Sequence, residues 1–272
     1  MLIDAFNEDC LDVLDTRAAE LKAPNRLYLL IDGAFVPGLH KTLATEWKSL
    51  LFASLPGFSD NAADASPFLT PYIHEDKRMR SLLRRCIGWP MLSLIETPES
   101  LAQLAARLSA WCIVEADDQR FNFRFPDTRR LPAIFRTLDC TQREQFAGPA
   151  TRWSYIGRDS VWYELNVIGV GVGAEPVTNP VLDSQQFAAL VDDSRIDEML
   201  VLLGDRGYEV GKHPSVSHAS VSVALLVAVS ARLVDDDLPD WCEWYWRHAE
   251  TGHDCAANAA FQRWQNTYLM EK

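Results

Sequence analysis

The sequence has little positive charge and no long hydrophobic run, and each shortage excludes a class of protein. Lys and Arg number 26 against 38 Asp and Glu, so the formal net charge is −12 at pH 7. Nucleic acids and anionic membranes attract positively charged surfaces, so this balance argues against either as the main partner. The longest apolar run, residues 221–229, is interrupted by Ser222 and is far shorter than a membrane span.

Cysteine is also scarce, with six residues in a chain of 272. That number does not form a disulfide framework, so reduced thiols of a cytoplasmic protein are expected. The first ten residues, MLIDAFNEDC, are acidic and lack the basic start and small-residue cleavage site of a signal peptide. Apolar residues make up 48% of the chain and charged residues 24%, which is ordinary globular usage. We therefore expect an acidic globular protein of the cytoplasm.

Residues 1–168 alternate between strand and helix patterns. Short continuous apolar runs such as LYLLI are typical of strands buried on both faces, and apolar residues at helical spacing follow them. Strands are expected at residues 27–31, 91–95, 121–125, 153–156 and 161–168, and helices at 39–51, 79–87, 98–108 and 132–138. This order predicts an α/β domain with a mostly parallel sheet and flanking helices.

The pattern changes in the second part of the chain. A Gly- and Pro-rich connector is expected at residues 169–182, and an acidic, smaller, all-helical lobe at residues 183–272. Asp183 and Gln186 form a capping box, and Ser194 is expected to begin a second helix that ends at Gly204. Two more helices are expected at residues 215–234 and 238–268.

Asp32 is the first candidate for chemistry because it directly follows the strand expected at residues 27–31. Open α/β sheets present functional carboxylates at that position. A phosphatase-type site would need a second aspartate at residue 34, where this chain has alanine, so a turn-capping role is favoured. The glycine run at residues 169–173 is followed at once by Glu175 and Pro176, without the helix that a nucleotide-binding loop requires.

Metal ligands and nucleophiles are not indicated by their spacing. Cys242, His248, His253 and Cys255 are the only cluster of soft ligands, and their spacing fits no metal-binding finger. No G-x-S-x-G elbow is present. Neighbouring acidic residues are typical of solvated helix starts. We therefore predict no catalytic residues, no metal site and no cofactor.

Two surfaces are candidates for binding a partner. The helix expected around residues 77–87 buries an apolar stripe and presents Arg78, Arg84 and Arg85 on its other face. This face is either an ordinary solvated surface or a docking strip for an acidic partner or for the acidic lobe itself.

The second surface is the aromatic segment WCEWYWR at residues 241–247. Trp241 and Trp244 share a helical face, which would be part of the core or a binding surface. Trp246 points elsewhere and would be exposed or covered by a partner. We assign all three tryptophans to partner binding.

Several segments, in order, resemble the effector adaptor or chaperone family of bacterial type VI secretion systems. They are RLYLLIDGA from residue 26, WKSLLF from residue 47, SPFLTPYI from residue 66, FNFRFPDTRRLPAIF from residue 121 and QFAGPATRW from residue 145. Members of that family end their first strand with Asp-Gly-Ala, and carry Phe-Arg-x-x-Asp-x-Arg and Phe-x-Gly-Pro before a Trp. The residues assigned to the family pattern are Asp32, Gly33, Trp47, Arg124, Asp127, Arg129, Gly148, Pro149 and Trp153.

The family usually has an aromatic residue before the motif aspartate and a proline after it, where this chain has Pro126 and Thr128. This departure concerns the local turn. We expect the motif residues to be architectural, with an Arg–Asp pair that fixes the turn and a further pairing with Asp32 as a hypothesis.

The resemblance implies a non-enzymatic adaptor in the cytoplasm. Such adaptors bind a toxic effector protein and load it onto a VgrG-type spike, sometimes through a PAAR-type tip protein. Nucleic acid and membrane are not expected partners. Two alternatives are a metal-dependent hydrolase or phosphotransferase that uses Asp32 and Asp127, and an immunity protein that binds only a toxin domain.

Overall fold

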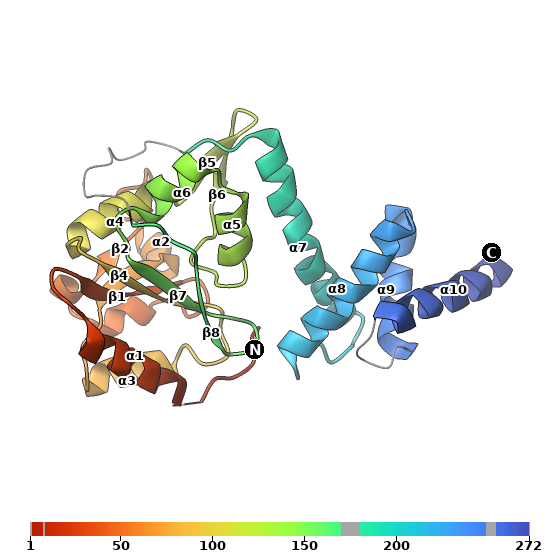
Figure 1. Cartoon of the computed structure of the whole chain (residues 1–272), viewed down its shortest axis with the longest axis horizontal. Coiled ribbons are helices and arrows are strands. Elements are labelled where there is room, and N and C mark those ends of the chain that lie inside the picture. Colours follow the sequence, from red (N-terminus) through yellow and green to blue (C-terminus); the bar gives the residue numbers. More distant parts are fainter. Residues whose placement is uncertain (1, 8, 170–179, 249–253, 272) are drawn as a thin grey trace. The chain divides into compact units, whose positions relative to one another are not determined.

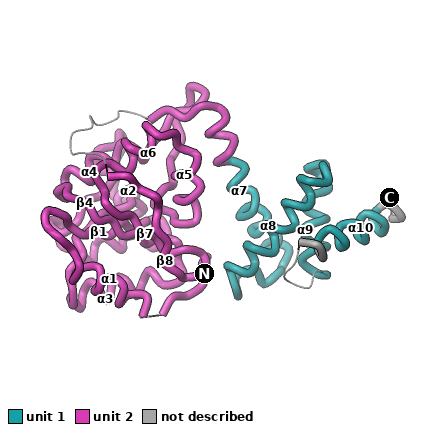
Figure 2. The backbone as a smooth tube through the Cα atoms, in the orientation of Figure 1, with its two compact units in different colours: residues 1, 191–272 teal, residues 2–190 magenta. Residues whose placement is uncertain are grey.

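A computed structural model describes residues 2–7, 9–169, 180–248 and 254–271. Residues 2–190 form one compact unit and residues 191–272 another, with the division inside one long helix (Figure 2). The connector and lobe boundaries expected from the sequence stay predictions. None of the described helices is long and apolar enough to cross a membrane.

The first unit is built on a six-stranded sheet in which every neighbouring pair is antiparallel. The strands, in their spatial order, are β2 (Ser49–Leu50), β3 (Phe68–Pro71), β1 (Arg26–Ile31), β4 (Leu92–Thr97), β7 (Arg152–Ile156) and β8 (Trp162–Glu164). The prediction of a mostly parallel sheet is therefore wrong. The strands expected at residues 153–156 and 161–168 are present as β7 and the shorter β8, which form a hairpin across the turn at residues 157–161.

The sheet is buried on both faces, which explains the error. Tyr28 and Leu30 of β1 point into one core, whereas Leu29 and Ile31 point into the other. The helices α4 (Leu101–Ala110), α5 (Leu131–Thr137) and α6 (Cys140–Ala147) contribute to the first core, and α1 (Asp9–Glu20) and α3 (Lys77–Arg84) contribute to the second (Figure 1). Continuous apolar strands follow from two covered faces, and an antiparallel sheet with helices on both sides produces the same pattern.

The single helix expected over residues 39–51 is also wrong. That segment contains two short 3₁₀ helices, η1 (Leu39–Thr42) and η2 (Thr45–Trp47), and then β2, which pairs with β3. The Nζ atom of Lys48 donates hydrogen bonds to the carbonyl oxygens of His40 at 2.6 Å and Leu43 at 2.9 Å. Sheet pairing and these bonds outweigh the helical spacing of the leucines.

Three smaller elements complete the first unit. Helix α2 (Asp60–Ala65) precedes β3, and a separate two-stranded ladder pairs β5 (Ile113–Ala116) with β6 (Gln119–Asn122). The strand expected at residues 121–125 thus ends at Asn122, and Phe123 and Phe125 are buried in the core without strand pairing.

The described residues of the second unit are helical. Its elements are the second part of α7 (Ser184–Asp205), α8 (Pro214–Ser230), η3 (Asp235–Asp237), α9 (Leu238–His248) and α10 (Asp254–Glu271). The single helix expected at residues 238–268 is wrong, because α9 and α10 are separate helices that pack against each other. Ser194 does not begin a new helix, because it lies inside the continuous α7. Its hydroxyl donates a hydrogen bond to the Val191 carbonyl oxygen at 2.7 Å. The core of this unit surrounds Trp241.

Candidate functional site

Asp32 and Arg124 form an ion pair at the end of β1. The Asp32 carboxylate is buried and accepts hydrogen bonds from the Ala34 backbone N–H at 3.0 Å and from Arg124 Nη2 at 2.9 Å. Burial raises the pKa of Asp32, and the guanidinium of Arg124 opposes that shift. The Arg124 side chain is 43% exposed, so the pair joins a buried carboxylate to a cation at the surface.

Asp127 and Arg129 form a second pair in the same motif. Arg129 donates to the Asp127 carboxylate from Nε at 3.0 Å and from Nη2 at 2.7 Å, which is the bidentate geometry of a strong charge-assisted contact. The backbone N–H of Arg129 donates to the same carboxylate at 3.0 Å. These bonds fix the turn that leads into α5, as expected from the sequence.

An aromatic pair links the two ion pairs. The guanidinium carbons of Arg124 and Arg129 lie 5.5 and 5.7 Å from the centre of the Phe35 ring, and that ring stacks on Trp89 with centroids 6.0 Å apart. We call these six residues the Asp32 cluster: Asp32, Phe35, Trp89, Arg124, Asp127 and Arg129. Phe35 and Trp89 were not predicted, because no sequence pattern relates two isolated aromatics to a motif some 35 to 90 residues further on.

The chemistry open to the Asp32 cluster is limited by these contacts. Both carboxylates already accept hydrogen bonds from an arginine and from the backbone. A cavity of about 80 Å³ beside Asp32 and Arg124 is walled mainly by apolar side chains, including Phe52 and Phe123. Among the residues that the structure describes, no group of three or more His, Cys, Asp or Glu side chains is arranged to hold a metal ion.

Gly33 is required by a close approach of two backbone segments. A Cβ atom at this position would lie 2.3 Å from the carbonyl oxygen of Ser66, which is part of the backbone just before β3. The Asp-Gly step after β1 therefore places the Asp32 carboxylate, and at Gly33 it lets the backbone near Ser66 pack closely against the end of β1.

The Gly148–Pro149 turn is held by a third ion pair, between Glu99 and Arg107. Arg107 donates to Glu99 from Nε at 2.9 Å and from Nη2 at 2.6 Å, and it also donates to the carbonyl oxygen of Phe146. Gly148 has a φ of 55°, and a Cβ atom there would lie 2.5 Å from Arg107 Nε. Glu99 and Arg107 were not predicted, since neither stands in a recognisable motif.

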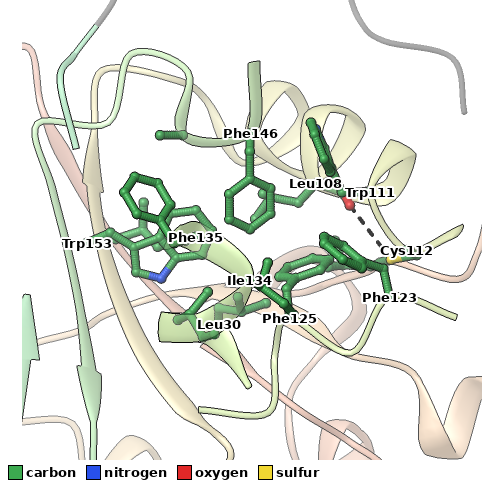
Figure 3. Close-up of a cluster of buried hydrophobic side chains, with 14 of the residues drawn as sticks. Leu30, Leu108, Trp111, Cys112, Phe123, Phe125, Ile134, Phe135, Phe146 and Trp153 are labelled. Carbon is green, nitrogen blue, oxygen red and sulfur yellow. Dashed lines mark hydrogen bonds between the residues drawn. The ribbon is translucent and has the colours of Figure 1, made fainter. Parts of the chain in front are cut away.

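The tryptophan that follows this turn belongs to the core. Trp153 on β7 is fully buried and stacks on Phe146 of α6 with centroids 5.0 Å apart. Figure 3 shows Phe146 among Trp111, Phe125 and Trp153. The Phe-x-Gly-Pro segment and its tryptophan thus tie α6 to the sheet. Trp47, by contrast, is 45% exposed in η2.

The surfaces predicted to bind a partner have different outcomes. Helix α3 buries Met79, Leu82 and Leu83, and leaves Arg78, Arg84 and Arg85 exposed, so the basic strip is present in the structure. Its role in binding stays a prediction. The neighbouring Arg80 is not free, because its guanidinium contacts Asp12 and Asp15 of α1.

Trp241 offers no surface to a partner. It is fully buried, its indole N–H donates to the carbonyl oxygen of Ala224 at 2.9 Å, and its ring packs edge-on against Phe261. Its assignment to partner binding is corrected to a core role. Trp244 and Trp246 are partly buried and pack against the same core, so their assignment stays a prediction.

Two further segments lie partly outside the described residues. These are positions 170–173 of the glycine run, and His253 with the side chain of Cys255 in the group of soft ligands. His248 Nδ1 lies 2.8 Å from the carbonyl oxygen of Trp244, and the Cys242 thiol is buried in the core.

Comparison with known proteins gives a partial assignment. Residues 27–145 match the family model of a domain of unknown function, DUF4123. This family is associated with effector adaptors of type VI secretion systems. The matched segment contains the whole Asp32 cluster and ends before the Gly148–Pro149 turn. No curated protein and no solved structure gives a significant match.

Proposed function

We propose that the chain is a non-enzymatic adaptor, which binds a type VI secretion effector in the cytoplasm and loads it onto the VgrG-type spike or its PAAR-type tip. The DUF4123 match over residues 27–145 supports an adaptor. The absence of an enzymatic role is proposed from the hydrogen bonds that the two motif carboxylates, Asp32 and Asp127, already accept. Asp32 and Asp127 are each held by an arginine and a backbone N–H, which suits a structural lock better than a metal or proton-transfer site.

The two compact units suggest a division of work between the two partners. The first unit contains the family segment, and we assign the spike to it. The helical unit carries 14 acidic and 7 basic residues between positions 191 and 272, and we assign the effector to it. A complex of this kind needs an interface of ordinary size with a few aromatic anchors and complementary charge, so that the effector is held and later released.

Secretion in the native bacterium tests the proposal. Deletion of this gene is expected to abolish release of the effector encoded beside it, while the spike protein is still released. Loss of both proteins would indicate a general assembly factor, and unchanged release of the effector would contradict the adaptor role. Complementation with the Asp127→Asn variant separates structure from binding, since a stable variant that no longer binds the spike would contradict an architectural role for Asp127.

An exchange of helical units tests the division of work. Replacement of residues 191–272 of this chain with the helical unit of a second type VI adaptor is expected to give the chimera the effector choice of that second adaptor. Retention of the original effector by the chimera would place effector recognition in the first unit instead.

A further inference from the structure

Helix α8 carries no Asp, Glu, Lys or Arg between Pro214 and Ser230, although charged residues make up 24% of the chain. Its core side, which includes Val221, Ala224 and Ala228, packs against α9 and α10. A helix that is uncharged all round is typical of one that is covered on all sides. In the described part of the helical unit, however, the opposite side of α8 lies at the surface.

The exposed side of α8 is an apolar stripe. Val216, Leu226 and Val229 are 52%, 63% and 68% exposed, and Ala219 and Val223 lie between them at helical spacing. We call these five residues the α8 face. Single exposed apolar residues are ordinary, but a continuous stripe of them along a helix is a candidate interface.

The outer residues of the α8 face are placed symmetrically about a midpoint that directly follows Ser222. When two copies of α8 run antiparallel across a twofold axis at that point, residues equally far from it come face to face. Val216 then faces Val229 of the second copy, and Ala219 faces Leu226 of the second copy. The small side chain of the alanine leaves room for the larger leucine, and the symmetry repeats this match at the other end of the pair.

The charges beyond the two ends of α8 favour the same arrangement. Glu209 and Lys212 are exposed before the helix begins, and Arg232 and Asp236 are exposed after it ends. An antiparallel pair brings the first two residues of one copy near the last two of the other, so that carboxylates and cations of different copies meet. A parallel pair would instead place each charge beside the same charge of the second copy, which is unfavourable.

We infer that the α8 face joins two copies of this chain into an antiparallel dimer. The inference goes beyond the proposed function, because an adaptor could load its effector as a monomer. Apolar contacts in the middle and charged residues at the ends match the core and the rim of a protein interface. The symmetry of the face is the reason to choose a second copy, since a helix of another protein would require no such symmetry.

Size-exclusion chromatography with light scattering of the full-length protein tests the dimer. At micromolar concentration the measured mass is expected to be twice the chain mass of 30.7 kDa. Leu226→Glu should raise the dissociation constant of the dimer at least about tenfold, because it places a carboxylate in the apolar part of the interface. Val201→Glu is the matched control, since Val201 is 63% exposed on α7 outside the α8 face, and it should leave the constant unchanged. A wild-type protein that stays monomeric, or equal weakening by both variants, would overturn the inference.

Disulfide cross-linking tests the direction of the two helices. Val216→Cys and Val229→Cys are prepared separately in a background with Cys10→Ser, Cys140→Ser and Cys255→Ser. The antiparallel dimer is expected to cross-link only when the two proteins are mixed, because two copies of the same new cysteine would lie about 20 Å apart. Cross-linking of either protein alone with the same yield as the mixture would overturn the inference.

Circular dichroism melting checks that each variant folds, and the cross-linking keeps the inference testable if Leu226→Glu does not fold. A monomeric wild-type protein whose Leu226→Glu variant no longer binds the effector would assign the α8 face to the effector and overturn the dimer. Failure of the dimer would leave the adaptor role untouched, because the secretion assay does not depend on it.

Discussion

Arg124 donates a hydrogen bond across 2.9 Å to the carboxylate of Asp32, a residue 92 positions earlier, and so connects the segment after β6 to the end of β1. The carboxylate is almost fully buried and the guanidinium is not. Removal of Arg124 and removal of Asp32 should therefore lower the free energy of unfolding by different amounts.

Arg124→Ala is expected to lower the free energy of unfolding by about 3 kcal/mol at pH 7, because it leaves Asp32 buried and unpaired. Asp32→Asn should cost much less, since the amide keeps the shape and the exposed guanidinium can be solvated. The double variant should recover most of the loss. Urea denaturation measures all three, and Arg120→Ala, which removes only an exposed pair with Glu115, is the control with an expected change below about 1 kcal/mol.

The same pair predicts a pH dependence. Burial raises the pKa of Asp32 above its value in the unfolded chain, so the folded protein binds this proton more tightly. The stability from this group is fully present below the unfolded pKa and is lost as the pH rises through the folded pKa. The cost of Arg124→Ala should therefore be small near pH 4 and largest at neutral pH; a cost independent of pH would contradict this account.

Gly33→Ala is expected to destabilise the first unit by about 1–3 kcal/mol, because the added Cβ would overlap the Ser66 carbonyl oxygen. Gly204→Ala is the matched control, since a Cβ there meets only Val210 at 3.4 Å in the last turns of α7. Thermal melting should show a clear loss for the first variant and little change or a gain for the second. Equal losses would mean that the backbone near Ser66 can move aside.

Thiol reactivity should separate the cysteines by burial. Burial raises the pKa values of Cys86, Cys112 and Cys242 to about 12, so at pH 8 these thiols stay protonated and inaccessible in the folded protein. In a background with Cys10→Ser, which removes a half-buried thiol, and Cys255→Ser, Ellman's reagent should react rapidly with the exposed Cys140 and with the three buried thiols only after denaturation. Cys140→Ser should remove the fast phase, and rapid reaction of a buried thiol would contradict the packing described here.

The basic strip on α3 predicts an electrostatic effect on association. Replacing Arg78 and Arg85 with glutamine should slow binding to an acidic partner several-fold and weaken its dependence on salt, with no change in stability. The control replaces Arg120 and Arg136, two exposed arginines elsewhere on the first unit, with glutamine. Surface plasmon resonance at two salt concentrations measures the rates; equal slowing by both pairs would mean that the strip is an ordinary solvated surface.

The sequence predicted the strands of the sheet better than their direction. The runs at residues 27–31 and 91–95 correspond to strands β1 and β4, because short segments made almost wholly of apolar residues have few other places to be buried. The apolar pattern of a strand indicates how many faces of the sheet are covered. Whether neighbouring strands run parallel or antiparallel depends on which strands lie side by side. Here β1 lies between β3 and β4, and that choice is made by long-range packing that local periodicity does not contain.

The candidate site was predictable only where a motif marked it. Asp32, Arg124 and Asp127 were identified and their pairing was foreseen, since oppositely charged residues at strand ends tend to meet. Phe35 and Trp89 were missed, because they enter the cluster through the fold. Trp241 was assigned to partner binding because it belongs to the aromatic segment at residues 241–247. Its place on the apolar face of α9 is enough to bury it.

The most direct test of the adaptor role is reconstitution from three purified proteins: this chain, the effector encoded beside it and the VgrG-type spike. Size-exclusion chromatography with light scattering is expected to show a ternary complex, and no effector in the spike fraction when this chain is omitted. Binding to the effector but never to the spike would indicate a chaperone or an immunity protein. Effector that reaches the spike without this chain would contradict the central claim.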